Sequence, residues 1–339
     1  MASEFEEILG YIQDKNIMVV GDLMIDRYIY GKVNRISPEA PVPIVEIEDT
    51  EDRLGGAANV ALNLASLGVE PIVISVIGRD TDAYRMLDLL KQNNIRGEGI
   101  ILSEERKTTL KTRIVSHATQ MLRLDEEIIT DISDQLETAL IDKFVESVEI
   151  NEPAVVIFQD YNKGVLTPKV IRNLLQVCKE LAIPTAVDPK RKNFFAYSDC
   201  TLFKPNLKEA SEGLNFSINP NDINSLVKAA QLIEEKLYNT QTIITLSELG
   251  IFGYENTNSL ISPSRIHKVF DVSGAGDTVI AVLGICLALN IDLEIALEIA
   301  NIAASIVCVK RGVSTVTKHE LVMEVEKHLY GSKNNTLLG

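Results

Sequence analysis

The sequence has few cysteines, and they are not arranged as a disulfide framework. Four occur among 339 residues, widely spaced and without a CxxC motif. Such cysteines are typical of a reducing compartment, where a buried thiol packs as a small hydrophobic side chain. We therefore expect a cytoplasmic protein. The cysteines are Cys178, Cys200, Cys286 and Cys308.

Basic residues are also scarce. Lysine and arginine together number 33, against 48 aspartates and glutamates, so the formal net charge is −15 at pH 7. A nucleic-acid partner requires a basic face that meets the phosphate backbone, and this charge argues against one. A small phosphorylated ligand is still compatible with it, because such a ligand needs only a few local cations.

Targeting and membrane segments are missing too. No apolar run is long enough to span a bilayer, so we expect no membrane partner. The N-terminus, MASEFEEILGYIQ, is acidic and lacks the basic region and apolar run of a signal peptide. The polar tail, residues 331–339, is expected to be flexible.

Two common nucleotide-site signatures are not found. The sequence contains no GxxxxGK[ST] motif, which excludes a P-loop enzyme. No GxGxxG motif follows the first apolar run, which disfavours a dehydrogenase that binds a dinucleotide.

Short apolar runs alternate with amphipathic helical segments along most of the chain. This alternation predicts an α/β fold with a mostly parallel sheet and helices on both faces. We expect one domain over residues 1–330. The expected strands are 17–22, 72–77, 154–158, 185–188, 201–203 and 242–246. The expected helices are 57–67, 84–93, 134–148, 168–181, 206–213, 226–237, 277–289 and 292–309.

Two segments interrupt this alternation, at about residues 23–50 and 98–125. Both alternate polar and apolar residues, which predicts short antiparallel strands. We expect them to form a small sheet beside the main domain that acts as a lid. Their apolar alternation would expose one sheet face unless a partner covers it, so we expect a homodimer through the lid sheet.

The segment Asp271-Val272-Ser273-Gly274-Ala275-Gly276-Asp277-Thr278 is the most informative part of the sequence. Small residues before an apolar run predict a loop that enters a helix, where free backbone N–H groups and the helix dipole bind an anion. Asp277 beside such an anion would accept a proton from an attacking hydroxyl, which suggests phosphoryl transfer to an alcohol. The alternative is a plain glycine-rich turn before a buried helix, and these eight residues alone do not decide.

Polar residues also fall at or just after the ends of predicted strands. Ligands of open α/β sheets bind at the carboxyl ends of the strands, so the shared placement favours a ligand site. Any one of these residues could instead cap a helix or form a turn. The set comprises Asp22, Asp160, Asp188 and Asn206.

A glycine pair opens the first predicted helix. Gly55 and Gly56 would let a ligand approach the backbone, and Asn59 could bind a sugar hydroxyl. A tight turn with close helix packing is the alternative.

Two later motifs suit a nucleotide. Asn206 and Glu209 lie on one face of a first helical turn and could hold Mg2+ with its waters, but taken alone they favour a capping box. The stretch Thr245-Leu246-Ser247-Glu248-Leu249-Gly250 follows a buried strand, so it could contact nucleotide phosphate or ribose, or be an ordinary turn.

In their order and spacing, the motifs around Gly55, Asn206 and Asp277 resemble the PfkB or ribokinase-like family of sugar kinases, over roughly residues 10–325. The resemblance implies an α/β/α domain with a β lid, ATP as phosphoryl donor and Mg2+. It also implies roles for the matching residues. They are Asp277 as catalytic base; Gly274, Ala275 and Gly276 as anion hole; Asn206 and Glu209 at Mg2+ and phosphate; and Asp271, Thr245, Ser247, Glu248 and Gly250 at the nucleotide, where the family often has Gly in place of Ser247.

A narrower resemblance is to the kinase domains of the heptose 7-phosphate kinase/ADP-heptose synthase family. It implies phosphorylation of the C1 hydroxyl of D-glycero-D-manno-heptose 7-phosphate for lipopolysaccharide precursors. The bifunctional members carry a C-terminal nucleotidyltransferase domain, for which we expect this sequence to be too short. Lys190-Arg191-Lys192 stands where Lys-Gly is common. The matching segments are Gly21–Tyr28, Arg35–Pro43, Gly55–Ala61, Asp160–Gly164, Asp188–Lys190 and Leu246–Gly250.

The substrate residues follow from this resemblance. Sugar hydroxyls are expected to contact acids and amides near the first strands, and a substrate phosphate needs cations, each of which could instead be a solvated surface residue. The set is Asp22, Asp26, Gly55, Gly56, Asn59, Arg113, Arg123, Asp160, Lys163, Asp188 and Lys190. Two other functions stay open: a kinase of another sugar, sugar phosphate or nucleoside, and a non-catalytic sugar-binding regulator.

Overall fold

The computed structural model describes residues 4–117, 119–265, 270–310 and 312–330; the tail predicted at 331–339 lies outside them. Within this part of the chain the central sheet has nine strands, in the order β13-β12-β11-β10-β9-β8-β1-β4-β5. The neighbours from β11 to β5 pair in parallel, and β12 and β13 add an antiparallel edge. The strands are β1 (Ile17–Gly21), β4 (Ile72–Gly78), β5 (Arg96–Ser103), β8 (Val155–Gln159), β9 (Thr185–Asp188), β10 (Leu202–Phe203), β11 (Gln241–Thr245), β12 (Ile251–Glu255) and β13 (Asn258–Ser262).

Apolar residues on both faces of the strands hold two helical layers against the sheet. In β1, Ile17 and Val19 enter one core, whereas Met18 and Val20 enter the other. Side chains of a strand alternate between faces, so a strand covered on both sides must be apolar throughout. The mostly parallel sheet predicted from the sequence is thereby confirmed.

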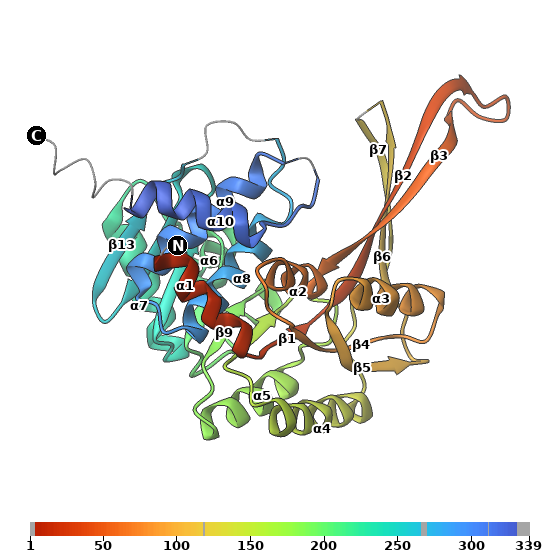
Figure 1. The fold of residues 1–339 in the computed structure, drawn as a ribbon. Coiled ribbons are helices and arrows are strands. Elements are labelled where there is room, and N and C mark those ends of the chain that lie inside the picture. Colours follow the sequence, from red (N-terminus) through yellow and green to blue (C-terminus); the bar gives the residue numbers. More distant parts are fainter. Residues whose placement is uncertain (1–3, 118, 266–269, 311, 331–339) are drawn as a thin grey trace, which may run out of the picture.

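Figure 1 shows the helical layers around the sheet. Helices α1 (Glu4–Gly10), α2 (Ala57–Ser66), α3 (Thr81–Gln92), α8 (Ala275–Ala288), α9 (Leu293–Cys308) and α10 (Lys318–Val325) supply the first core. Helices α4 (Asp134–Asn151), α5 (Pro168–Glu180), α6 (Leu207–Leu214) and α7 (Ile223–Leu237) pack on the other side. Four single turns complete the described helices: η1 (Tyr11–Asp14), η2 (Arg191–Asn193), η3 (Ser247–Leu249) and η4 (Glu326–Tyr330). Within the ranges given above, no helix is both long and apolar enough to cross a membrane.

A second, smaller sheet projects away from this body, as Figure 1 shows. Its order is β3-β2-β6-β7, and the predicted small sheet is thereby confirmed. Two antiparallel hairpins are joined by a parallel pairing of β2 with β6, so the sheet is not wholly antiparallel as predicted. The strands are β2 (Leu23–Ile36), β3 (Pro43–Gly56), β6 (Thr109–Ser116) and β7 (Thr119–Glu126).

The predicted limits of this sheet were wrong in two places. Residues 98–103 belong to β5 at the edge of the central sheet, and β3 continues past residue 50 to Gly56. β2 and β3 are also long, with 14 residues each. β5 is a half-buried edge strand, so it shows the same polar and apolar alternation as the projecting strands.

The hairpin of β12 and β13 was not predicted. Its two-residue turn is Asn256-Thr257, and both residues have positive φ, 48° and 69°. Such turns usually contain glycine, which is the sequence signal that predicts a hairpin. Without it, the segment resembled an irregular connection.

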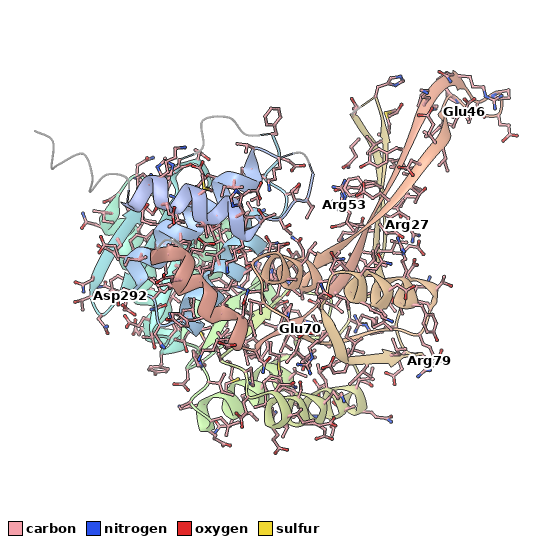
Figure 2. The ribbon with its side chains drawn as sticks, viewed as in Figure 1. Arg27, Glu46, Arg53, Glu70, Arg79 and Asp292 are labelled. Carbon is pink, nitrogen blue, oxygen red and sulfur yellow. The ribbon has the colours of Figure 1, made fainter. Side chains whose placement is uncertain are left out.

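The two faces of the projecting sheet differ in chemistry. Register places Asp26 opposite Arg53 and Tyr28 beside Arg113, so one face is polar and charged. Figure 2 shows Arg53, a residue of the polar face, on the side of the strands that faces the body. The other face carries an apolar cluster. The apolar cluster comprises Ile29, Ile47, Ile114, Leu122 and Leu124.

Candidate active site

A cavity of about 440 Å³ lies where the carboxyl ends of β9, β10 and β11 meet the start of α8. Parallel strands bring their carboxyl ends to one edge of a sheet, which is where ligands of such folds bind. The cavity collects twelve of the residues that the sequence singled out. They are Asp188, Lys190, Asn206, Glu209, Thr245, Ser247, Glu248, Gly250, Gly274, Ala275, Gly276 and Asp277.

The start of α8 forms one wall of this cavity. Gly274 is the residue before the helix and has φ +82°, a conformation that favours glycine. The Asp271 carboxylate accepts a hydrogen bond of 2.9 Å from the Ser273 backbone and so shapes the turn without lining the cavity. First-turn N–H groups have no partner within their helix, so this wall can bind an anion.

Asp277, in the first turn of α8, is almost fully buried. Its carboxylate accepts hydrogen bonds from Asn59 at 2.7 Å, Tyr161 at 2.8 Å and Gln159 at 3.1 Å. Burial raises the pKa of Asp277 to about 6, while the hydrogen bonds from Asn59 and Tyr161 limit the rise. A carboxylate with this pKa is ionised at neutral pH and is readily protonated.

Two lysines bring positive charge to the same cavity. Lys204 Nζ lies 2.9 Å from the Asp188 carboxylate, and Lys190 Nζ lies 3.9 Å from it and bonds Glu209. Burial opposes the charge of Lys190, but Asp188 and Glu209 prevail and raise its pKa. Lys190 therefore stays charged beside the anion-binding wall.

Only one of these two lysines was predicted from the sequence. Lys190 was predicted to bind a substrate phosphate, whereas its Nζ lies beside Glu209 at the start of α6. Lys204 was not predicted at all. The signal in the sequence was a charged residue directly after the apolar pair Leu202–Phe203. In the structure only 2% of the surface of Lys204 is exposed.

Asn206 and Glu209 form the capping box that the sequence favoured. Asn206 Oδ1 accepts from the Glu209 backbone at 2.8 Å, and Glu209 Oε2 accepts from the Asn206 backbone at 2.9 Å. Glu209 Oε1 bonds Lys190, so both oxygens of this carboxylate have partners. Among the described residues no group of three or more His, Cys, Asp or Glu could hold a metal ion. These residues do not fit a direct metal site, and contact with Mg2+ through water stays a prediction.

Residues at the end of β11 and after it also line the cavity, and their contact with a nucleotide stays a prediction. They are Thr245, Ser247, Glu248 and Gly250, and Ser247 has φ +55°, where glycine is favoured. Apolar side chains for which the sequence suggested no ligand contact of their own also line the cavity. They are Ile251, Val272, Val279, Ala304 and Cys308.

Asp22 lies behind the cavity rather than in it. Its carboxylate accepts three backbone hydrogen bonds, from Tyr161 at 2.9 Å, Lys163 at 3.0 Å and Val165 at 3.1 Å. Burial raises the pKa of Asp22, and these hydrogen bonds oppose the rise. Asp22 therefore holds the loop after β8, and its contact with sugar stays a prediction.

Asp160 does not line the cavity either. It accepts from the Tyr197 hydroxyl at 2.9 Å, and burial with the nearby Asp22 charge raises its pKa to about 7. The loop that Asp22 and Asp160 support carries Tyr161 into the cavity. Gln159 was missed, because nothing in the local sequence distinguishes it from a core residue, and Tyr161 was included in the matching segment Asp160–Gly164 without a role of its own.

The remaining predicted substrate residues lie around the base of the projecting sheet. Asp26 Oδ1 bonds Arg113 at 2.5 Å, and a side chain at Gly55 would collide with the Asp26 carboxylate. Gly56, with φ +61°, precedes α2, which carries Asn59 to Asp277. Of the sequence-predicted residues, Asp26 and Gly55 thus lie against each other, and Gly56 opens the helix that brings Asn59 to Asp277.

Two of the cations predicted to bind a substrate phosphate are paired with carboxylates. Arg123 is half exposed on β7 and pairs with Asp125 at 2.9 Å, while Lys163 pairs with Glu127 at 2.7 Å. Arg113 lies 5.3 Å from the Tyr28 ring centre, and the unpredicted Arg53 lies 4.6 Å from the same ring. A side chain at Gly312 would collide with Arg53, so this arginine reaches the loop after α9.

Comparison with known proteins gives the same assignment at the level of family. A family model described as pfkB family carbohydrate kinase matches residues 14–320. The bifunctional protein HldE of Campylobacter fetus is 43% identical over 297 residues, which are 88% of this chain and 63% of that protein. The chain spans a little under two thirds of the length of the curated relatives it matches.

Solved structures share the fold. Phosphofructokinase-2 from Escherichia coli in complex with potassium superposes with a TM-score of 0.78 at 19% identity, over 94% of this chain and 99% of that one. Ribokinase from Arabidopsis thaliana complexed with ribose and ATP gives 0.70 at 14% identity, over 92% and 99%. At these identities the similarity concerns the fold alone.

The Asp22 geometry predicts a structural role for this carboxylate. Replacing Asp22→Asn puts an amide N–H2 against backbone donors, and we expect the free energy of unfolding to fall by roughly 1–3 kcal/mol. Urea denaturation measures this change. Asp222→Asn is the control, because asparagine caps a helix as well as aspartate does, and it should change stability by less than about 0.5 kcal/mol. Equal stability of the two variants would contradict the role.

Proposed function

This chain belongs to the pfkB family of carbohydrate kinases, and we propose that it transfers the γ-phosphoryl group of ATP to the C1 hydroxyl of D-glycero-D-manno-heptose 7-phosphate. The observation that carries the chemistry is Asp277 in the first turn of α8, in one cavity with Lys190 and Lys204. The choice of heptose rests on the similarity to bifunctional protein HldE and on the segments around Asp22, Asp160 and Asp188.

The reaction is a single in-line displacement. The sugar hydroxyl oxygen forms a bond to the γ-phosphorus, the bond from that phosphorus to the β,γ-bridging oxygen breaks, and ADP leaves. The hydroxyl proton passes to Asp277. Mg2+ arrives with ATP as part of the substrate and offsets phosphate charge. Lys190, Lys204 and the N–H groups of α8 stabilise the charge on the transferring group.

The protonation state of Asp277 gives the reaction its pH dependence. Only the carboxylate can accept the proton, and its pKa is about 6. The value of kcat/KM should therefore decrease as the pH falls through about 6.

The substrate phosphate is placed at the base of the projecting sheet, which acts as a lid in this proposal. Arg53 and Arg113 flank Tyr28 on the face toward the body, beside Asp26. Arg113 is buried enough that only 17% of its side chain is exposed. Guanidinium groups bind phosphate in a fixed geometry, so this pair suits a sugar that is already phosphorylated.

The lid sheet is also where we place a homodimer contact. Its outer face exposes Ile47 by 65%, Leu122 by 52% and Leu124 by 49%. An apolar sheet face of this kind is typical of an interface, and a second lid would cover it with the same residues. We place the enzyme in the cytoplasm, in keeping with its four buried free cysteines.

The role of Asp277 is tested by Asp277→Asn. Asparagine keeps the size of the side chain but cannot accept the proton, so kcat should fall by on the order of 100- to 10,000-fold. Nucleotide binding, measured by calorimetry, should change little. Asp222→Asn is the control, since Asp222 lies outside the cavity and asparagine caps a helix as well as aspartate does, so kcat should not change. Unchanged turnover of Asp277→Asn would reject it as the base.

The substrate is tested with a panel of sugars and sugar phosphates in a coupled ADP assay. Heptose 7-phosphate should give the highest kcat/KM. Arg53→Met should lower this value by roughly 10- to 100-fold and leave the value for unphosphorylated sugars nearly unchanged. Faster turnover of an unphosphorylated hexose would reject the substrate, and sugar binding without ADP release would indicate a regulator.

The dimer is tested by Leu124→Asp, which places a charge in the apolar outer face. Light scattering should show a dimer for the unchanged protein and a monomer for this variant. Gln120→Asp is the control, because register with Val115 puts that residue on the opposite face. A monomer for the unchanged protein at working concentration would contradict the assignment.

A further inference from the structure

Tyr161 lines the cavity and contacts two of its charged residues. Its hydroxyl donates a hydrogen bond of 2.8 Å to Asp277 Oδ1, and its ring lies 5.4 Å from Lys190 Nζ. The Tyr161 backbone N–H donates to the buried Asp22 carboxylate, which also holds two further N–H groups of the loop. The Tyr161 backbone is therefore held by Asp22, the residue that directly follows β1 of the central sheet.

Three side chains donate hydrogen bonds to the Asp277 carboxylate. A carboxylate has about four acceptor positions. Asn59 occupies one on Oδ2, and Gln159 and Tyr161 occupy two on Oδ1. Among the described residues Asn59 is the side chain that donates to Oδ2, so this oxygen can also accept from an incoming hydroxyl.

The three donors are not equivalent. Asn59 and Gln159 are completely buried amides, whereas the side chain of Tyr161 lines the cavity. Burial and the charges of Asp277 and Asp188 raise the pKa of Tyr161 well above its ordinary value, so its hydroxyl remains a donor at every working pH. Phenylalanine keeps the ring and removes only the hydroxyl, with its hydrogen bond to Asp277 and its contact with Gln159.

We propose, on the basis of the kinase function above, that Tyr161 is a positioning residue which orients the Asp277 carboxylate and keeps it ionised for proton abstraction. A hydrogen bond donated to a carboxylate stabilises its charged form. Without the Tyr161 hydroxyl, the carboxylate would lose a donor on Oδ1 and would bind a proton more readily. The phenol thus offsets part of the cost of burying the base.

Other groups that face Asp277 also act on its pKa, and Asn59 lowers it through the same kind of hydrogen bond. Asp188, at the end of β9, raises the pKa of Asp277, while Lys204, after β10, lowers it. The Lys190 charge also interacts with Asp277, and Asn59 on α2 and Gln159 on β8 are neutral. These groups stay in place when Tyr161 becomes phenylalanine, so a shift of the pKa would come from the lost hydroxyl.

The test is Tyr161→Phe, with kcat/KM measured from pH 5 to pH 9. The acidic limb, expected near pH 6, should move upward by about one pH unit, the size expected for one hydrogen bond to a charged group. At high pH, where Asp277 is ionised in both proteins, most of the rate should return. A uniform loss at all pH values, or an unchanged profile, would overturn the proposal.

Tyr197→Phe is the matched control. Tyr197 is also a buried tyrosine that donates to a carboxylate, but its partner is Asp160, outside the cavity. Its removal should leave the midpoint of the acidic limb unchanged. An equal shift in both variants would show that the limb responds to general loosening and would also overturn the proposal.

A titration without turnover separates this proposal from the kinase function. The Asp277 carboxyl carbon can be followed by 13C NMR in the full chain, and its pKa should rise by about one unit in Tyr161→Phe. If the pKa rises but no sugar is phosphorylated, the proposed function fails and the role of Tyr161 on the carboxylate stands. If the pKa of Asp277 does not change, the role of Tyr161 is rejected.

Discussion

The burial of the Asp277 carboxylate is the constraint on which the rest of the site depends. A charged group loses its hydration when it is buried, and it stays ionised only if hydrogen-bond donors replace the water. Here the donors come from Asn59 on α2, Gln159 on β8 and Tyr161 on the following loop. Each of these elements must therefore hold its position against α8 for the carboxylate to exist at neutral pH.

The same requirement extends through a second layer of buried acids. Asp22 holds the backbone of the loop after β8, and Tyr197 connects Asp160 to the aromatic core beneath it. Neither acid lines the cavity, but Asp22 binds the backbone N–H of Tyr161 and Asp160 that of Asn162. Asp188 has an intermediate place, because it pairs with Lys204 and lies close to Lys190, the cations that would meet the phosphates. Acid and base chemistry in this site thus rests on polar contacts that reach into the sheet.

Much of this architecture could be predicted from local patterns, and the misses have physical causes. Apolar runs such as Ile17–Gly21 predicted strands because both faces of the sheet are covered. The start of α8 was predicted because Gly274 has a conformation that favours glycine. β5 was assigned to the lid because a half-buried edge strand has the same alternation as a lid strand. Lys204 was missed and Tyr161 was given no role of its own, because one charged or aromatic residue in a loop has no local pattern.

The sequence by itself determined the layered fold, the glycine loop with its acid, and the order of motifs that identifies a sugar kinase. Those properties depend on neighbours in the chain: the period of apolar residues, the freedom of glycine, and a capping box such as that of Asn206 and Glu209. Only the tertiary structure decided which acids face the cavity and which lie behind it. That distinction depends on the strand order of the sheet, which brings Asn59 within 2.7 Å of Asp277 although 218 residues separate them.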